Sequence, residues 1–552
     1  MIRFENVSVT YDGETTPILR NIDLELFEGE MVLVVGRTGS GKTTFLQTIN
    51  GLMPHFTGGT LSGRVTIDDR DTQTNPPREL ADLVGVVAQD PARGFVADTV
   101  EEELAFGMEC LGLAPEVMRR RVEETLDLLG LNDLRYRPLM TLSAGQQQRV
   151  AIGAVLTSHP KVLVLDEPTS ALDPGAAEEI LAALQRLVHD LGITVVMAEH
   201  RLERVVQYVD RVIVVPGNAA PLIVGTPQEV MRTAPIAPPV VELGRVAGWN
   251  PLPLSVRDAR RVAGPLRTLL IDQIPPVRSN ESTQDSEVLS EAQQLTIQYG
   301  QHTALKAVSL AIRSGEVVAL MGRNGAGKST LLNAMVGLRF ASSGSITTHG
   351  KDPRTLKGVE LLNSVGLVPQ SPGDLLEATS VGDECKAADR DANVESGTTR
   401  ALLDLLAPEI DHATHPRDLS EGQRLLLALV IVLAARPPLL LLDEPTRGLD
   451  YPTKIRLVDA LRNLALAGHA IILATHDVEL AAEVATRVIV LAEGEVVADG
   501  PTADVVVASP MFAPQIAKVM APYPWLTVTD VVNTIGPLIL RSHAPISGDA
   551  LT

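Results

Sequence analysis

The chain has 552 residues, 45% hydrophobic, 21% charged and 3% aromatic, with a formal net charge of −21, which indicates a globular protein of several domains. The negative charge disfavours nucleic acid as a partner, and the scarcity of aromatic residues disfavours single-strand binding by stacking. Cys110 and Cys385 lie far apart with no CxxC or Cys/His cluster, which excludes a cysteine-based zinc or iron–sulfur site and fits a reducing cytoplasm.

The beginning of the chain predicts an α/β domain. Met1 to Glu5 contain no basic segment followed by an apolar core, so no secretion signal is expected. Residues 2–10 alternate like a strand, and Met31 to Val35 form an apolar run typical of a buried strand. The longest apolar run, 425–435, is about half the ~20 residues needed to span a bilayer, so any membrane role should come through a partner.

A glycine-rich loop follows the apolar run, and a helix is predicted after it. Glycine, small polar residues, lysine and a hydroxyl at this spacing are typical of a phosphate-binding loop before a helix N-terminus. Lysine supplies a charge for the β- and γ-phosphates, and the hydroxyl is placed to ligate Mg²⁺. The predicted ATP-binding loop consists of Gly36, Arg37, Thr38, Gly39, Ser40, Gly41, Lys42, Thr43 and Thr44.

Five further signals follow in chain order. They are Gln89, a helical insert exemplified by Pro115 to Leu129, the motif Leu142 to Gln146, and an apolar strand ending in Asp166-Glu167; a later strand ends at His200. Taken singly, an Asp-Glu pair is often a solvated strand end and a lone histidine is often structural. The ordered set favours a nucleotide hydrolase.

The same set recurs in the second half of the chain. Lys328 follows Lys42 by 286 residues, and the Asp-Glu-Pro-Thr motif recurs 277 residues later, as does the Leu-Ser-x-Gly-Gln motif. Three motifs repeated in one order indicate two copies of one nucleotide-binding domain. The predicted organisation is a first ATPase domain at 1–235, a Pro-rich linker and accessory segment at 236–286, a second ATPase domain at 287–508 and a C-terminal tail at 509–552.

These motifs resemble those of the ATP-binding cassette (ABC) ATPases over both halves of the chain. The resemblance implies an ATP hydrolase with two P-loop cassettes, each with a helical insert, paired head to tail within the chain. It implies catalytic roles for Glu167, His200, Glu444 and His476, and Mg²⁺ ligation through Thr43, Gln89, Asp166, Ser329, Gln370 and Asp443. The implied ATP contacts beyond the first loop are Tyr11, Gln89, Ser143, Gly145, Gln146, Tyr299, Gly322, Arg323, Asn324, Gly325, Ala326, Gly327, Lys328, Ser329, Thr330, Gln370, Ser420, Gly422 and Gln423; Asp173 and Asp450 resemble the D-loop aspartates.

The head-to-tail pairing implies two composite ATP sites. Lys42 would act with Ser420, and Lys328 with Ser143. Glu421 replaces the usual glycine of the second signature motif, and Leu426 stands where the first copy has Arg149. A carboxylate near the γ-phosphate is unfavourable, so we expect both sites to hydrolyse ATP at unequal rates.

A finer similarity is to the ATPases of energy-coupling factor importers. It is carried by Gln89-Asp90-Pro91 and by the stretch Thr99 to Gly107, although Ala92 to Phe95 depart from the Asn/Gln-rich sequence expected there. This similarity implies a peripheral motor on the cytoplasmic face of the membrane. Its partners would be a transmembrane coupling subunit and a small substrate-binding membrane subunit, and its cargo a vitamin, a vitamin precursor or a transition-metal ion.

The competing function is that of a soluble tandem-cassette ATPase acting on ribosomes. Proteins with that function resemble this chain in domain count, but the linker between their domains is typically a pair of charged helices. Here the region between the cassettes is broken by prolines, and the net charge is unfavourable next to RNA. A tandem sugar-import ATPase often lacks the second lysine, which is present here as Lys328.

Overall fold

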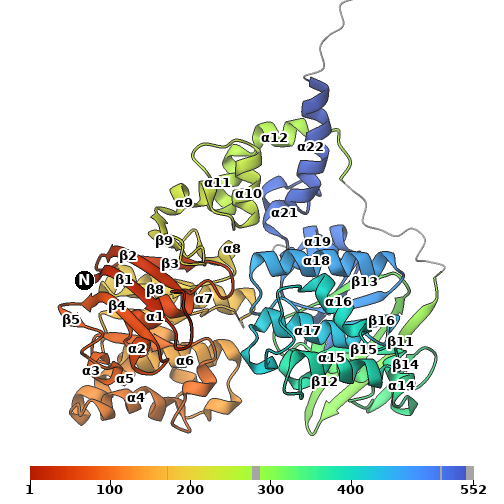
Figure 1. Cartoon of the computed structure of the whole chain (residues 1–552). Helices are drawn as coiled ribbons and strands as arrows, with labels where there is room; N and C mark the ends of the chain where they lie inside the picture. Colours follow the sequence, from red (N-terminus) through yellow and green to blue (C-terminus); the bar gives the residue numbers. More distant parts are fainter. Residues whose placement is uncertain (171, 276–285, 510–511, 543–552) are drawn as a thin grey trace, which may run out of the picture. The chain divides into compact units, whose positions relative to one another are not determined.

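The computed structural model describes residues 1–170, 172–275, 286–509 and 512–542. The chain divides into two compact units, one of Met1–Pro238 with Arg447–Pro452 and one of Pro239–Thr446 with Thr453–Thr552 (Figure 1). Each unit contains an α/β domain built on a six-stranded sheet, as the sequence predicts.

Up to Thr233 the chain alternates strands and helices around two sheets. The elements are β1 (Ile2–Thr10), β2 (Leu19–Leu26), β3 (Met31–Val35), α1 (Lys42–Ile49), α2 (Leu52–His55), β4 (Thr60–Ile67), β5 (Arg70–Asp71), α3 (Pro77–Leu80), β6 (Val84–Val87), η1 (Pro91–Gly94), α4 (Val100–Cys110), α5 (Pro115–Leu129), η2 (Asn132–Leu134), η3 (Leu139–Thr141), α6 (Ala144–Leu156), β7 (Val162–Asp166), α7 (Pro174–Leu191), β8 (Thr194–Ala198), α8 (Leu202–Val205), β9 (Arg211–Val214), β10 (Ile223–Gly225) and α9 (Pro227–Thr233).

From Pro239 onward the same pattern recurs between two groups of additional helices. The elements are α10 (Pro239–Val246), α11 (Val256–Val262), α12 (Gly264–Leu269), β11 (Val288–Tyr299), β12 (His302–Arg313), β13 (Val317–Met321), α13 (Lys328–Met335), β14 (Ser343–Thr348), η5 (Pro353–Thr355), α14 (Val359–Leu362), β15 (Val365–Val368), η6 (Pro372–Leu375), α15 (Val381–Asp391), α16 (Thr398–Leu406), η7 (Pro416–Asp418), α17 (Glu421–Leu433), β16 (Leu439–Asp443), α18 (Tyr451–Leu466), β17 (Ala470–Ala474), α19 (Val478–Val484), β18 (Arg487–Ala492), β19 (Glu495–Pro501), α20 (Thr502–Ala508), α21 (Gln515–Met520) and α22 (Val528–Ser542).

The two large sheets have the same strand order. The first runs β6-β7-β8-β3-β9-β10 and the second β15-β16-β17-β13-β18-β19, parallel except for the last strand of each. Their central strands are almost wholly apolar and buried, because a parallel sheet is covered by other elements on both faces. A smaller antiparallel sheet completes each domain, in the order β2-β1-β4-β5 and β12-β11-β14.

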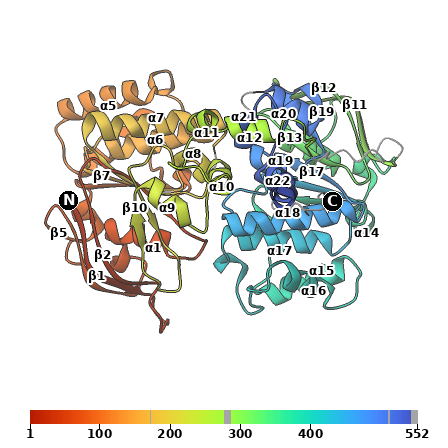
Figure 2. The same cartoon turned by 90° about the horizontal axis from the view of Figure 1, so that it is seen from above.

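Each domain carries a helical insert between the strand before the glutamine and the strand that ends in Asp-Glu. In the first insert α5 begins with Pro115 and ends before Gly130, which has φ 62°. Its buried face includes Val122, Leu126 and Leu129, which are part of the helical periodicity of the sequence. In the second insert α15, α16 and α17 pack together (Figure 2).

Helices from both sides of the second domain pack together into an accessory module. It consists of α10, α11, α12, α21 and α22, which contact one another within the second unit (Figure 1). Gln515 Oε1 accepts a hydrogen bond from Val240 N at 3.1 Å, and Arg267 Nε donates to Val519 O at 3.1 Å. The segments that the sequence assigned to a linker and a tail thus pack against each other; residues 276–285 of that linker lie outside the described residues.

The accessory module also contacts the second α/β domain. Gln515 N donates to Glu479 Oε1 at 2.7 Å, and Ala513, Ala517 and Leu526 pack in one cluster with Ala481 of α19. None of the described helices combines the length and the apolarity needed to cross a membrane.

Trp525 lies in the core of the accessory module with 0% of its side chain exposed. We expect Trp525→Ala to lower the free energy of unfolding of the second unit by about 3–5 kcal/mol, because a large apolar contact is replaced by a cavity. Scanning calorimetry of the full chain measures this as a lower transition temperature. Val532→Ala on α22, 38% exposed, is the matched control and should change stability by about 0.5 kcal/mol or less. Equal effects of the two substitutions would contradict this packing.

Candidate functional site

Four of the predicted site segments in each domain lie at one edge of its large sheet. Parallel strands end at a common edge, and ligands of such sheets bind in the crevice beyond it. In the first domain the glycine-rich loop follows β3, Glu167 follows β7, His200 follows β8 and Gln89 follows β6. The same four loops follow β13, β16, β17 and β15 in the second domain.

Both glycine-rich loops have backbone conformations that require glycine. Gly41 and Gly327, the N-cap residues of α1 and α13, have φ 104°, a left-handed conformation. A Cβ atom on Gly36 would lie 2.4 Å from Val215 O, and one on Gly322 would lie 2.3 Å from Leu491 O. Each loop can therefore curve tightly into a helix N-terminus, where backbone N–H groups attract anions.

The two loop lysines make the same hydrogen bonds to the backbone of their loops. Lys42 Nζ donates to Gly36 O at 3.0 Å and to Arg37 O at 3.1 Å, and Lys328 Nζ donates to Gly322 O at 2.9 Å and to Arg323 O at 3.3 Å. Burial lowers the pKa of Lys42, against the charges of Glu167 and Asp166. Both ammonium groups are thus held inside their own loops, where a phosphate would lie.

Other positions of the first loop also fit a phosphate ligand. Ser40 Oγ is buried and has no hydrogen-bond partner among the described residues, which is unfavourable unless a ligand supplies one. Arg37 and Thr43 are exposed, whereas Thr44 is buried. In the second loop Arg323, Asn324 and Gly325 are exposed, Ala326 is buried, and Ser329 and Thr330 are half-buried.

Glu167 is the centre of the polar contacts in the first domain. Its Oε1 lies 3.0 Å from His200 Nε2, and its Oε2 accepts from Gln89 Nε2 at 3.0 Å. Burial alone would raise the pKa of Glu167, but the hydrogen bond and charge of His200, with Lys42 and Gln89, hold it below its ordinary value. The carboxylate is therefore ionised and oriented from two sides.

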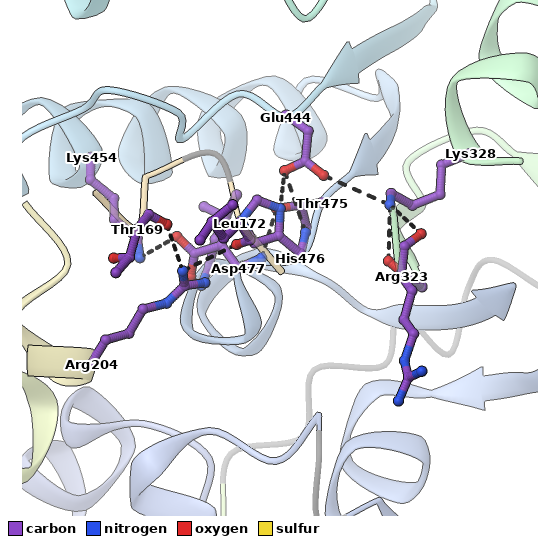
Figure 3. A network of polar contacts seen from close by, with 12 residues as sticks. Thr169, Leu172, Arg204, Arg323, Lys328, Glu444, Lys454, Thr475, His476 and Asp477 are labelled. Atoms are coloured by element: carbon purple, nitrogen blue, oxygen red, sulfur yellow. Dashed lines mark hydrogen bonds and ion pairs between the residues drawn. The ribbon is translucent and has the colours of Figure 1, made fainter. Parts of the chain in front are cut away.

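Glu444 occupies the corresponding position in the second domain, with different contacts (Figure 3). Its Oε2 lies 2.7 Å from His476 Nδ1, and its Oε1 lies 3.8 Å from Lys328 Nζ. Gln370, at the position that corresponds to Gln89, is exposed, as Gln89 is. The two domains thus present different ring nitrogens to their glutamates.

Both glutamates have a strained backbone. Glu167 and Glu444 each have φ 51°, a left-handed conformation that is uncommon for residues other than glycine. Such strain concentrates at functional sites, where the surrounding structure maintains it. The backbone N–H groups donate to Ala198 O at 2.9 Å and to Ala474 O at 2.8 Å, respectively.

The preceding aspartates and the loop hydroxyls fit a magnesium ion. Thr43 Oγ1 donates to Asp166 Oδ2 at 2.9 Å, and Ser329 hydrogen-bonds Asp443. Asp443 Oδ1 is buried without a hydrogen-bond partner among the described residues, so an additional ligand would satisfy it. Burial raises the pKa of Asp166 and of Asp443, and a bound cation would oppose that shift. One hydroxyl and one carboxylate suit Mg²⁺, which usually takes its other ligands from phosphates and water.

The two tyrosines among the implied ATP contacts differ. Tyr11 is half-buried, and its hydroxyl lies 2.7 Å from Thr44 Oγ1 of the glycine-rich loop. Tyr299 is 41% exposed, and the guanidinium of Arg339 lies 5.3 Å from its ring centroid. Tyr11 is therefore fixed against the loop, whereas Tyr299 is exposed and contacts Arg339.

The Leu-Ser-x-Gly-Gln motifs cap α6 and α17. Ser143 Oγ accepts from Gln146 N at 3.3 Å, and Gln146 Oε1 accepts from Ser143 N at 2.9 Å. Ser420 and Gln423 form the same capping box. Gly145 and Gly422 lie in the first turns of these helices. The N-terminal end attracts anions and also stabilises Glu421 in the first turn of α17.

Sequence analysis missed two buried glutamates that hold loops of this site. Glu103 Oε2 accepts from Val96 N and Ala97 N, both at 2.9 Å, and thereby fixes the segment that follows Gln89. Glu199 precedes His200 and accepts two hydrogen bonds from Thr169. The only signal for them in the sequence is a glutamate at a position that is expected to be buried. Helical periodicity could indicate such a position for Glu103 but not for Glu199.

Comparisons with known proteins agree with this architecture. The family model described as "ABC transporter" matches residues 19–170 and again 305–447. A protein of Streptomyces avermitilis, named as an ABC transporter ATP-binding protein, is 62% identical over 96% of this chain and 99% of its own length. A protein of Methanosarcina mazei named in the same way is 35% identical over 92% of this chain and 90% of its own length.

Solved structures with two cassettes share the fold. "Model of ribosome-bound archaeal Pelota and ABCE1" has a TM-score of 0.63 at 21% identity, covering 93% of this chain and 80% of that chain. "RNase-L Inhibitor" has a TM-score of 0.58 at 22% identity, covering 91% and 92%. At this level of identity the likeness concerns the fold alone.

One buried loop lysine in each domain predicts two ATP sites. Lys42→Ala and Lys328→Ala should each reduce ATP affinity at one site by about tenfold or more, because a buried cation next to the phosphates is lost. Titration with a fluorescent ATP analogue should show one remaining high-affinity site in each single variant and none in the double variant. Two unchanged sites in either single variant would contradict the assignment of that loop.

Proposed function

The chain belongs to the ABC transporter family and hydrolyses ATP, and on this premise we propose that it is the motor subunit of an importer of the energy-coupling factor type. The observation that carries the motor part of the proposal is the presence of a buried loop lysine, glutamate and histidine at the sheet edge of both domains. A degenerate second site would weaken the case for a motor with two active cassettes.

In each site the protein residues supply position and charge for phosphoryl transfer to water. The loop N–H groups and Lys42 would hold the β- and γ-phosphates, and His200 would contact the γ-phosphate. Glu167, ionised and anchored by His200 and Gln89, would orient the attacking water and accept its proton. Lys328, Glu444 and His476 would do the same in the second domain (Figure 3).

Thr43 with Asp166, and Ser329 with Asp443, would hold Mg²⁺ with ATP, and Gln89 and Gln370 would approach it from the next loop. The ion supplies neutralisation of the charge that develops on the phosphate oxygens. Release of the Thr43 hydroxyl from Asp166 would free both groups for this role.

The importer assignment is supported by the segment around Gln89 and by an exposed apolar surface next to it. Val96, Tyr136 and Met140 are 64%, 73% and 79% exposed. The two segments that carry them are joined by backbone hydrogen bonds, among them Leu139 N to Asp98 O at 2.9 Å. We call Val96, Tyr136 and Met140 the insert surface. These exposed apolar side chains are the contacts that the proposal assigns to the transmembrane coupling subunit.

The proposed complex lies on the cytoplasmic face of the membrane and includes a small substrate-binding membrane subunit. Its cargo is a vitamin, a vitamin precursor or a transition-metal ion. Nucleic acid is not part of the proposal, because the net charge of −21 opposes contact with phosphate backbones.

Affinity purification of the tagged chain from detergent-solubilised native membranes, followed by mass spectrometry, tests the importer assignment. We expect a multi-span coupling protein and a small membrane protein to be recovered. Recovery of ribosomal proteins without a membrane partner would replace the importer by a ribosome-associated ATPase.

The insert surface gives a sharper prediction for the same experiment. Tyr136→Asp and Met140→Asp should reduce recovery of the membrane partner by about tenfold or more, because a charge would be buried in an apolar contact. The matched control is Leu405→Asp, at a site 77% exposed on α16 of the second insert. All variants should keep the thermal transition of the parent. Equal losses at Leu405 and Met140 would exclude the insert surface as a specific docking site.

The different contacts of the two glutamates predict unequal sites. Glu167→Gln and Glu444→Gln should leave different residual ATPase rates, by about twofold or more, because Glu421 and the histidine contacts distinguish the second domain from the first. Steady-state phosphate release by the purified chain measures both rates. Equal residual activities would show that these differences do not affect hydrolysis.

A further inference from the structure

Glu199 links two loops of the first site through one buried carboxyl group. It follows β8 directly, precedes His200 and is 1% exposed. Its Oε1 accepts from Thr169 N and from Thr169 Oγ1, both at 2.7 Å. Thr169 lies two residues after Glu167. The carboxyl group therefore ties the segment that carries Glu167 to the segment that carries His200.

The peptide of Thr169 is also held from its other side. Arg204 Nη1 donates to Thr169 O at 3.0 Å and to Leu172 O at 3.1 Å (Figure 3). Glu199 thus satisfies the N–H and hydroxyl of Thr169, and Arg204 satisfies its carbonyl. Glu167 has φ 51°, and a strained backbone persists only where neighbouring contacts maintain it.

The surroundings of the second oxygen of Glu199 bear on the protonation state in which this carboxyl group is buried. Oε2 has no hydrogen-bond partner among the described residues. Burial and the charge of Glu167 raise the pKa of Glu199, against the hydrogen bonds of Thr169 and the charge of Arg204; His200 is its neighbour in the chain. A neutral carboxyl group accepts through its carbonyl oxygen, which a glutamine side chain can reproduce.

The second domain has a different residue at this position. Thr475 precedes His476, and its Oγ1 accepts from Asp477 N at 3.0 Å within the same turn. The backbone link from the glutamate N–H to the end of the neighbouring strand, β8 or β17, is present in both domains. In the first domain the carboxyl group of Glu199 thus bridges to the Asp-Glu-Pro-Thr segment. At the same position the second domain has the short side chain of Thr475, whose hydroxyl accepts a hydrogen bond within its own turn.

We propose that Glu199 is a positioning residue that orients Glu167, so that hydrolysis in the first domain depends on a side chain that the second domain does not use. The inference rests on the proposed role of Glu167 in hydrolysis. It makes the first site sensitive to any movement of β8 relative to the Thr169 segment, because both ends of the bridge must stay in register for the water to be oriented.

The test compares Glu199→Thr, which introduces the residue of the second domain, with Glu199→Gln. Both are made in a Glu444→Gln background, which reports on the first site, and in a Glu167→Gln background, which reports on the second. In the first background Glu199→Thr should lower kcat by about ten- to hundredfold with the KM for ATP within about twofold. Glu199→Gln should restore kcat to within about threefold of the background.

The decisive result is whether Glu199→Thr affects hydrolysis at the first site only. In the Glu167→Gln background Glu199→Thr should not change the remaining rate. Equal losses in both backgrounds, a change in KM alone, or no rescue by Glu199→Gln would overturn the proposal. If Glu167→Gln itself keeps the full rate of the parent, the proposed role of Glu167 fails, and that result is visible before any Glu199 variant is made.

A second readout does not require turnover. Thr169 N–H donates to Glu199, so hydrogen–deuterium exchange in the segment from Asp166 to Ser170 should accelerate in Glu199→Thr and stay unchanged in Glu199→Gln. The single Glu199 variants in the otherwise native chain serve for this experiment. Unchanged exchange in Glu199→Thr would overturn the proposal even where a background variant has no measurable ATPase rate.

Discussion

Each site depends on the burial of a parallel sheet on both of its faces. Strands that are apolar on both sides must run through the middle of the domain, so chemistry can occur only where they end. Because the strands are parallel, the loops after β6, β7, β8 and β3 share one edge, and they bring Gln89, Glu167, His200 and Lys42 together. The fold thus gathers residues that are more than a hundred positions apart in the chain.

Burying these charged groups together is electrostatically unfavourable, and contacts among their own side chains compensate for it. Lys42, Glu167 and His200 are each at most 9% exposed, and burial alone disfavours the charged forms of Lys42 and Glu167. Their mutual contacts compensate for this, as the net lowering of the Glu167 pKa by His200 and Lys42 shows. These three side chains are therefore polar, preorganised and shielded from water, the condition under which fixed dipoles and charges act most strongly.

The sequence predicted the fold well because its signals are local. A glycine-rich loop between an apolar strand and a helix specifies its own geometry, and the recurrence of three motifs in one order specified two such domains. The accessory module could not be predicted in this way, since its core joins Val240 to Gln515 across 275 residues. The role of Glu199 could not be predicted for a similar reason. Its partner Thr169 is distant in sequence, and a glutamate before a histidine is not part of a known motif.

The two domains agree where the backbone must be strained or tightly curved, and differ where side chains support it. Gly41 and Gly327 share one φ value, as do Glu167 and Glu444, because the turn after a central strand admits little variation. The supporting contacts have more freedom: Gln89 contacts the first glutamate and Lys328 the second, and Glu199 corresponds to Thr475. Duplication followed by change at these supporting positions can alter the rate of one site without altering its fold. Differences between the two sites therefore reside in the residues around the motifs, where motif comparison alone does not detect them.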